Sequence, residues 1–469
     1  MTTDERPVAA IATPLAQSAI GAIRVSGHDA VCLLAGRFSR PAALLDAPGH
    51  TIHHGTIRDS EGRALDEALV AVYRRPRSYT GEESAEIFCH GSPAGIRRVY
   101  AALLAAGFSA AEPGEFTRRA FSNGKLDLTR AEAVNEVVRA QTATAHALAL
   151  DRLSGRVERI VGEIRSELVA VMAQLAIQLD YPEEDTGDID VDSARLAAAG
   201  RRVRELASTF ARGRLYQDGA RVVLAGRTNA GKSSLFNALL RQDRSIVSDV
   251  HGTTRDYVEA LIDVEGVPVR LFDTAGLRAT SEKVEEEGIR RSRAVVAAAD
   301  LVLYVADAAV GLAGEDESRL EEIRGQAPVI VVMNKMDLAA GGAGATGGEP
   351  VAGASPPAGG AVHVSALTET GIDALNREIL ERLLADRGAV TESGSDTQTV
   401  VIDSERQHAL LVRAAEAVEQ TLESLAAGIP ADATAVDLQE ALDAVGEITG
   451  EVASAEILDA MFGSFCVGK

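Results

Sequence analysis

The chain has 469 residues, a length that predicts about three domains at roughly 150 residues each. Hydrophobic residues make up 46% and charged residues 25%, which is typical of globular domains with packed cores and argues against extended disorder. The 69 acidic and 47 basic residues give a formal net charge of −22. This charge restricts any contact with nucleic acid to local basic clusters, whose binding would depend on salt.

The sequence carries no sign of export or of a membrane span. Its first residues place acids where a signal peptide has bases, and no apolar run approaches the roughly 18 residues that cross a bilayer. The three cysteines, Cys32, Cys89 and Cys466, are too scattered for a disulfide framework or a zinc site. We therefore expect a cytoplasmic protein without a membrane partner.

Residues 1–125 mix short β-type runs with glycines and prolines, and contain an alanine-rich helical stretch near 95–106. This texture predicts a compact α/β domain. Its arginines are either solvated surface groups or a contact for RNA. They cluster at Arg74, Arg75 and Arg77, at Arg97 and Arg98, and at Arg118 and Arg119.

Helical spacing dominates residues 126–218 and returns over residues 386–469. One apolar stripe at helical spacing indicates helix packing rather than a cofactor site; it consists of Val157, Ile160, Val161, Ile164, Leu168 and Val171. Between the two helical stretches, residues 219–385 alternate β-type and helical segments. The pattern predicts one helical domain with an α/β domain inserted into it, and hence an α/β plus all-α multidomain fold.

The pattern of residues 219–385 predicts a parallel sheet flanked by helices. Its runs at 301–305 and 329–333 are continuously apolar, as in strands buried on both faces. Residues 339–360 are rich in glycine and alanine and predict a flexible insertion.

The segment Gly226–Ser233 matches G-x-x-x-x-G-K-[ST], directly after a predicted strand and before a predicted helix. In this context backbone N–H groups and the helix N-terminus hold phosphates. We expect Lys232 to reach the β- and γ-phosphates and Ser233 to bind Mg²⁺. The residues expected against the nucleotide here are Asn229, Ala230, Gly231, Lys232, Ser233 and Ser234.

Three further motifs follow in the order expected of a Ras-like P-loop G domain. The first would put an acid near the metal and a glycine near the γ-phosphate; it consists of Asp273, Thr274, Ala275 and Gly276. The second contains Asn334, Lys335 and Asp337, where the carboxylate suits guanine N1–H and its exocyclic amine. The third offers a backbone N–H to guanine O6; it consists of Ser365, Ala366 and Leu367. The four motifs together predict GTP binding.

The catalytic details differ from those of Ras-like enzymes. Leu277 occupies the position where those enzymes carry the glutamine that orients water. GTP hydrolysis still needs a positive charge near the bridging phosphate oxygens to stabilise the transition state. Asn229 and the loop 248–256 offer oxygens for a monovalent cation, although a capping or loop hydrogen bond is the alternative for Asn229.

Over essentially its whole length the sequence resembles the MnmE (TrmE) family of bacterial tRNA-modification GTPases. An inserted G domain within a helical domain is also that family's architecture. The resemblance is carried by segments 21–27 (GAIRVSG), 78–83 (SYTGEE), 113–117 (PGEFT), 123–128 (NGKLDL), 252–256 (GTTRD), 446–451 (GEITGE) and 464–469 (SFCVGK).

The resemblance implies a hydrolase of GTP that acts in tRNA modification as a homodimer, formed through the 1–125 domain. With a flavoprotein partner that carries FAD (MnmG, also called GidA), such proteins install an aminomethyl-type group, as in 5-carboxymethylaminomethyl uridine, at carbon 5 of the wobble uridine of certain tRNAs. The one-carbon donor is 5,10-methylenetetrahydrofolate or 5-formyltetrahydrofolate. Matching positions for the folate are Arg24, Glu86, Lys125 and Lys469.

The resemblance also implies the remaining catalytic and metal-binding positions. Mg²⁺ would take Ser233 and Thr254, and Glu285 would position the attacking water, with an exposed acidic helix face as its alternative. K⁺ would be bound by Asn229, Ser248, Val250 and Thr253. Cys466 matches a cysteine that is suspected of chemistry near the folate, with an inert thiol as the alternative.

A regulatory GTPase switch in ribosome assembly, without modification chemistry, is the competing interpretation. The G domain fits it equally well. The segments around Arg24 and Lys125 and the tail around Cys466 argue against it, because a pure switch has no evident need for them.

Overall fold

The computed structural model describes residues 6–180, 191–242, 258–273, 295–339, 360–386, 400–452 and 454–469. The chain divides into two compact units, and both are discontinuous in sequence. Unit 1 comprises Met1–Val138, Asp151–Gly200 and Arg413–Lys469. Unit 2 comprises Arg139–Leu150 and Arg201–Val412.

Unit 1 contains a mixed sheet of six strands in the order β3-β4-β5-β2-β1-β6. All neighbouring strands are antiparallel except β1 and β6. The strands are β1 (Val8–Ile11), β2 (Ile20–Ser26), β3 (Thr51–Arg58), β4 (Ala64–Tyr73), β5 (Ser84–His90) and β6 (Ser109–Ala110). The β-type runs in the sequence are thus confirmed as strands of one sheet.

Helix α3 (Pro93–Leu104) packs on this sheet and buries Ile96, Val99 and Leu103 in a common core with strand residues such as Ile23 and Ile87. It begins at Pro93, two residues before the predicted stretch near 95–106, because the Ser92 hydroxyl accepts a hydrogen bond from the Gly95 N–H and a proline follows that cap. The other helices of this part are α1 (Ala30–Ala35), α2 (Pro41–Leu45) and α4 (Glu115–Ser122).

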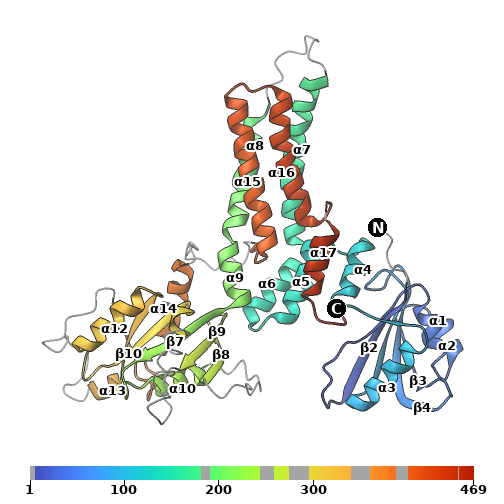
Figure 1. The fold of residues 1–469 in the computed structure, drawn as a ribbon, viewed down its shortest axis with the longest axis horizontal. Helices are drawn as coiled ribbons and strands as arrows, with labels where there is room; N and C mark the ends of the chain where they lie inside the picture. Colours follow the sequence, from blue (N-terminus) through green and yellow to red (C-terminus); the bar gives the residue numbers. More distant parts are fainter. Residues whose placement is uncertain are drawn as a thin grey trace. The chain divides into compact units, whose positions relative to one another are not determined.

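Long helices make up the rest of unit 1, and some of them extend beyond its residue bounds. Helix α7 (Arg156–Asp180) packs along α16 (Ala431–Thr449), so segments far apart in the sequence lie side by side (Figure 1). The predicted apolar stripe lies on α7, and all of its members except the half-buried Ile160 are buried. The remaining helices are α5 (Leu128–Arg139), α6 (Ala143–Leu153), α8 (Ser193–Ser208), α15 (Glu405–Ala426) and α17 (Ala455–Gly463).

Unit 2 contains a second six-stranded sheet, in the order β12-β11-β10-β7-β9-β8, that is parallel except for β8. Its strands are β7 (Ala220–Gly226), β8 (Val258–Val264), β9 (Val267–Asp273), β10 (Leu301–Asp307), β11 (Val329–Asn334) and β12 (Ala361–His363). Its helices include α9 (Phe210–Asp218), α10 (Lys232–Gln242), α12 (Gly314–Arg324), α13 (Met336–Ala339) and α14 (Ile372–Asp386).

Both faces of this sheet are buried, as the continuous apolar runs predict. On β7, Val222 and Leu224 join one core cluster, whereas Val223 and Ala225 join another on the opposite face. The predicted α/β plus all-α fold with an inserted parallel sheet is therefore confirmed. Among the described residues, no helix is both long enough and apolar enough to span a membrane.

Candidate functional site

The loop between β7 and α10 has a backbone that only glycine allows at two positions. Gly226 has φ of 131°, and a Cβ there would lie 2.1 Å from the Val305 carbonyl oxygen. Gly231 has φ of 92°, and its Cβ would lie 2.3 Å from the Asn334 side-chain nitrogen. The predicted strand–loop–helix arrangement is present, and the loop leads into the N-terminus of α10, a favourable place for phosphates.

Asn229 lies in this loop in the left-handed conformation, with φ of 66°. Its side chain is exposed and makes no hydrogen bond to the described part of the chain. The alternative of a capping or loop hydrogen bond therefore finds no support among these residues, and Asn229 remains available as a ligand. Ala230, next in the loop, is buried.

Lys232 and Ser233 are held by the loop and by the end of β9. The Lys232 Nζ donates to the carbonyl oxygens of Gly226 at 3.0 Å and Arg227 at 2.7 Å. The Ser233 Oγ donates to Asp273 Oδ2 at 2.9 Å, and this carboxylate is buried. A hydroxyl and a carboxylate oxygen side by side suit the oxygen preference of Mg²⁺. Ser234 lies exposed on α10.

Asn334 joins the phosphate loop to the predicted base-binding segment. Its Nδ2 donates to the carbonyl oxygens of Ala230 and Gly231, both at 3.3 Å. Its Oδ1 accepts the backbone N–H groups of Lys335 at 2.8 Å and Ala366 at 3.0 Å. The side chain is 1% exposed and all its polar capacity is used internally, so its role is to align two loops.

The neighbouring residues orient the candidate guanine contacts. Lys335 Nζ donates to Asp307 Oδ2 at 2.8 Å, and this hydrogen bond holds the pKa of the Asp307 carboxyl below its usual value. The Ser365 Oγ donates to Asp337 Oδ1 at 2.5 Å, which fixes the carboxylate that we expect to face guanine. Leu367 is exposed beside them. The structure thus brings the motifs around Asn334 and Ser365 together.

Several predicted site residues lie outside the described residues, so their positions are not part of this site. Among the predicted metal ligands, Asn229 is described for K⁺ and Ser233 for Mg²⁺. Those outside are Ser248, Val250, Thr253, Thr254, Thr274, Ala275, Gly276 and Glu285.

Unit 1 contains a cavity of about 400 Å³ that is lined by three of the four predicted folate contacts, Arg24, Glu86 and Lys469. Most of its remaining wall is aromatic or aliphatic. These other lining residues are Tyr73, Tyr79, Thr80, Ser84, Phe116, Val134, Val137 and Leu153. A partly apolar cavity with a few convergent charged groups is typical of small-molecule sites.

Arg24 is fixed by the sheet register and by the end of the chain. Strands β2 and β5 pair Arg24 with Glu86, whose Oε1 accepts from Nε at 3.0 Å and Nη2 at 2.7 Å. The third nitrogen, Nη1, donates to the Gly468 carbonyl oxygen at 2.9 Å. The guanidinium also lies 5.7 Å from the Phe116 ring centre and 6.0 Å from that of Tyr79.

The 466–469 tail lies against the start of α4. The backbone N–H of Phe116 donates to the Lys469 carbonyl oxygen at 3.1 Å, and Pro113 forms an isolated antiparallel bridge with Val467. Burial, and secondly the positive charge of Arg24, lower the pKa of the Lys469 ammonium. Lys469 is therefore a half-buried cation that would favour an anionic ligand group.

Two predicted residues do not line this cavity. Lys125 is exposed, and its Nζ donates to the Pro76 carbonyl oxygen at 3.0 Å. Cys466 is exposed in the tail, whereas Cys89 is buried in the sheet and burial raises the pKa of its thiol to about 11. His90, the next residue of the strand, pairs with Asp66 at 2.6 Å.

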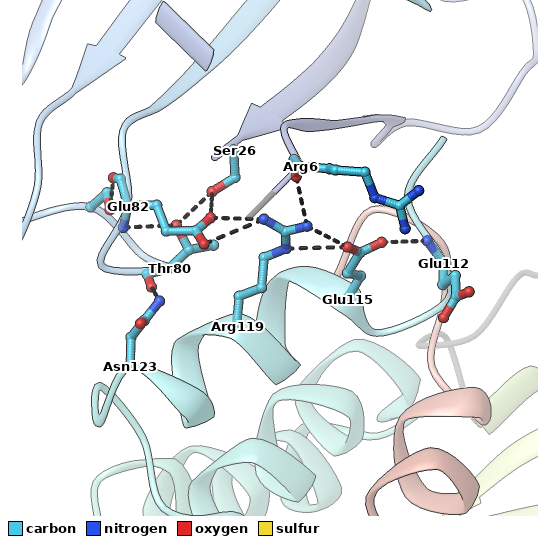
Figure 2. Close-up of polar contacts among 9 residues, drawn as sticks. Arg6, Ser26, Thr80, Glu82, Glu112, Glu115, Arg119 and Asn123 are labelled. Atoms are coloured by element: carbon cyan, nitrogen blue, oxygen red, sulfur yellow. Dashed lines mark hydrogen bonds and ion pairs between the residues drawn. The ribbon is translucent and has the colours of Figure 1, made fainter. Parts of the chain in front are cut away.

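Sequence reasoning missed the buried charge cluster behind the cavity. Figure 2 shows Arg119 of α4 between Glu82 and Glu115. Its Nη2 donates to Glu115 Oε1 at 2.6 Å and to the Arg6 carbonyl oxygen at 3.0 Å, and its Nη1 donates to Glu82 Oε2 at 3.2 Å. Glu82 Oε2 also accepts from the Ser26 Oγ at 2.8 Å.

This cluster reaches the cavity through Thr80. The Ser26 and Thr80 hydroxyl oxygens lie 2.7 Å apart, and Asn123 donates to the Thr80 carbonyl oxygen at 2.7 Å (Figure 2). Arg119 therefore fixes both α4 and the 78–83 loop, two parts of the cavity wall. Arg119 is buried, so the interpretation of the Arg118–Arg119 pair as solvated or RNA-binding arginines is wrong for this residue.

Comparison with known proteins covers the whole chain. Residues 7–125 match the family described as "GTP-binding protein TrmE N-terminus", and residues 128–466 match the "MnmE helical domain" family. The chain is 42% identical to the tRNA modification GTPase MnmE of Treponema denticola over 99% of this chain and 98% of that protein. It is 41% identical to the MnmE of Moorella thermoacetica over 98% of this chain and 99% of that protein. The chain therefore belongs to the MnmE (TrmE) family of tRNA modification GTPases.

Proposed function

We propose that this protein hydrolyses GTP to support modification of carbon 5 of the wobble uridine in certain tRNAs. The relatives named above are tRNA modification GTPases, and the described nucleotide site has the phosphate loop and guanine-binding motifs that such an activity requires. The observation that carries the proposal is that the same chain also holds a charged and aromatic cavity in unit 1, separate from the nucleotide loops of unit 2.

In the nucleotide site, the contacts of the described residues support the following roles. Lys232 would neutralise the β- and γ-phosphates, and Ser233 and Thr254 would hold Mg²⁺, with the Asp273 carboxylate near the metal. Asp337 accepts the N–H groups of guanine. When bound, the two metal ions neutralise charge on the phosphates.

In this proposal the chain's own oxygens would hold K⁺, which would supply the positive charge that an arginine finger provides in other GTPases. Asn229 supplies one ligand from the phosphate loop, and Glu285 positions the attacking water. The other ligands come from the following loop and are Ser248, Val250 and Thr253. The free side chain of Asn229 and the absence of a glutamine at Leu277 support this arrangement.

The unit 1 cavity is the proposed site of the folate one-carbon donor. The Glu86 carboxylate suits the N–H edge of a pterin, and Arg24 with Lys469 suits acceptor atoms and carboxylates. The rings of Tyr73, Tyr79 and Phe116 suit a flat heterocycle. The donor, 5,10-methylenetetrahydrofolate or 5-formyltetrahydrofolate, supplies the carbon, and Lys125 and Cys466 remain candidates for contact and chemistry.

The assembly that we propose is a cytoplasmic homodimer working with an FAD-carrying flavoprotein of the MnmG type. Membership in the MnmE (TrmE) family supports both the homodimer and the flavoprotein partner. G domains that close face to face would complete the K⁺ sites, so that hydrolysis needs no separate activator.

Mass spectrometry of wobble nucleosides tests the proposal. A strain that lacks the gene should lose the 5-substituted uridine and regain it with the wild-type chain. Neither Lys232→Ala nor Glu86→Gln should restore it, and Glu86→Gln should retain GTP hydrolysis. Unmodified nucleosides in the strain that carries the wild-type gene would instead support a switch without modification chemistry.

Salt dependence tests the metal assignment separately. GTP turnover should be much faster in K⁺ than in Na⁺, and Asn229→Ala should abolish that difference. Equal wild-type rates in the two salts would remove the cation role of Asn229 and Thr253.

A further inference from the structure

A second cavity of about 400 Å³ lies within unit 2, away from the phosphate loop. Its wall includes Arg221, the second residue of β7, and Asp300, which directly precedes β10. The phosphate loop instead follows Gly226, at the other end of β7. The cavity and the nucleotide motifs therefore occupy opposite edges of the same parallel sheet.

Arginines dominate the polar wall of this cavity. The four that line it are Arg139, Arg214, Arg221 and Arg270, and the acids that line it are Asp218 and Asp300. Arg221 and Arg270 are directly paired across β7 and β9, which places two like charges side by side. Such a pair is unfavourable unless an anion offsets it.

The two acids are engaged by other groups. Asp218 Oδ2 accepts from Arg214 Nε at 3.2 Å, and Arg214 also pairs with Glu405 at 2.6 Å. Asp300 Oδ2 accepts the backbone N–H of Arg221 at 2.8 Å. The guanidinium groups of Arg139, Arg221 and Arg270 have no ion pair or hydrogen bond with the residues that the structure describes, and all three residues are exposed.

The charge around this cavity contrasts with the rest of the chain. Residues 201–221 contain six arginines and two acidic residues, whereas the chain has a net charge of −22. Other basic clusters are partly neutralised. Arg74, for example, pairs with Glu83 at 2.6 Å and donates to backbone carbonyl oxygens as well.

We propose that Arg139, Arg221 and Arg270 bind backbone phosphates of the tRNA substrate at this cavity. Guanidinium groups bind phosphate through paired hydrogen bonds, and several unpaired ones around one polar cavity suit a polyanion with spaced phosphates. The inference rests on the proposed function for the identity of the RNA. Because phosphate contacts carry no sequence information, this surface would position the tRNA rather than select it.

The salt dependence of tRNA binding measures how many phosphate contacts these arginines make. Fluorescence anisotropy of labelled tRNA is recorded over a series of KCl concentrations, with GDP occupying the nucleotide site. Arg221→Gln and Arg270→Gln should each weaken binding and reduce the slope of log affinity against log salt by about 1, and the double variant by about 2. The Arg→Lys variants should keep most of the slope, because they keep the charge.

A matched control comes from the same unit. Arg377 is an exposed arginine on α14 outside the cavity, so Arg377→Gln should leave the slope unchanged. The thermal unfolding midpoint of each variant shows whether its fold is retained. If the wild-type chain fails to bind tRNA at any salt concentration, the proposed function fails and this inference with it. If the wild-type chain binds and the folded double variant keeps the full slope, the cavity assignment alone is overturned.

A small free phosphate compound is the other ligand that these arginines could bind. Calorimetry with inorganic pyrophosphate, again with GDP bound, distinguishes them. Pyrophosphate binding that disappears in the double variant, together with an unchanged tRNA slope, would assign the cavity to a small anion and overturn the RNA assignment. A reduced tRNA slope in the double variant supports the RNA assignment whether or not pyrophosphate binds.

Discussion

Arg24 and Gly468 lie 444 positions apart in the sequence, yet Arg24 Nη1 donates a hydrogen bond to the Gly468 carbonyl oxygen at 2.9 Å. The same guanidinium holds Glu86 through its other two nitrogens. One planar group thus connects the central strands of the sheet to the tail of the chain. A lysine in place of Arg24 could not make these contacts together, because it lacks the rigid fork.

Gly468→Ala should weaken ligand binding in the unit 1 cavity. Gly468 has φ of 94°, and a Cβ there would lie 3.2 Å from Ile11 O and from Ala12 Cα, a tight contact that needs a small adjustment of the tail or of residues 11–12. The left-handed backbone alone costs roughly 1–2 kcal/mol with a side chain. Calorimetric titration with 5-formyltetrahydrofolate measures the loss.

Gly62→Ala is the matched control for that backbone effect. Gly62 has φ of 80° but nothing within 4 Å of its Cβ position, so the same backbone strain arises without the tight contact. Equal folate affinities in the two variants would show that tail placement does not matter for the cavity.

Arg119→Met should destabilise the protein by about 3–5 kcal/mol, because it leaves two carboxylates, Glu82 and Glu115, without their buried partner. Arg118→Met should cost no more than about 1 kcal/mol, since Arg118 pairs with the exposed Asp459 on the surface. Urea unfolding followed by circular dichroism compares the two. Similar losses in both variants would contradict the central role of Arg119.

Asp337→Asn should change base preference from guanine toward xanthine. The Ser365 hydroxyl fixes this carboxylate, and an amide in its place would present a donor to guanine N1–H. GTP affinity should fall roughly 10- to 100-fold, the value of a hydrogen bond to a charged group. Competition between labelled GTP and XTP measures the preference, and unchanged selectivity for GTP would refute the guanine assignment.

The buried Cys89 thiol should make stability fall as the pH rises. Its pKa is raised to about 11 by burial, whereas an unfolded cysteine has a pKa of about 8.5. Above the unfolded value the unfolded chain loses the proton first, so this contribution is complete below that pH and is lost on the way to pH 11. Urea midpoints of wild type and Cys89→Ala between these pH values measure the effect, and parallel pH profiles would contradict it.

Much of the fold follows from sequence patterns because the periodicity of apolar residues reports burial directly. The run at 301–305 is found within β10, and the helical stripe beginning at Val157 is buried on α7 except for the half-buried Ile160. The phosphate loop is equally readable, since its glycines are required by backbone conformation alone. These features are local in the chain.

The features that the sequence does not reveal depend on contacts between distant segments. Arg118 and Arg119 look alike as neighbours, but successive helix positions face different directions, so one meets solvent and the other the core. The unpaired arginines Arg139, Arg221 and Arg270 are similar, because they come from three separate segments of the chain. Composition shows how many charges a region has, and only the fold shows which of them are neutralised.

The discontinuity of unit 1 has a consequence for biosynthesis. A ribosome makes the whole of unit 2, down to Val412, before it adds Arg413–Lys469, the last segment that unit 1 needs. Until then α7 lacks its partner α16 and Arg24 lacks the Gly468 carbonyl oxygen. All strands of the nucleotide-binding sheet are therefore synthesised before the unit 1 cavity is complete. Until α16 is made, the apolar face of α7 that packs against it stays uncovered.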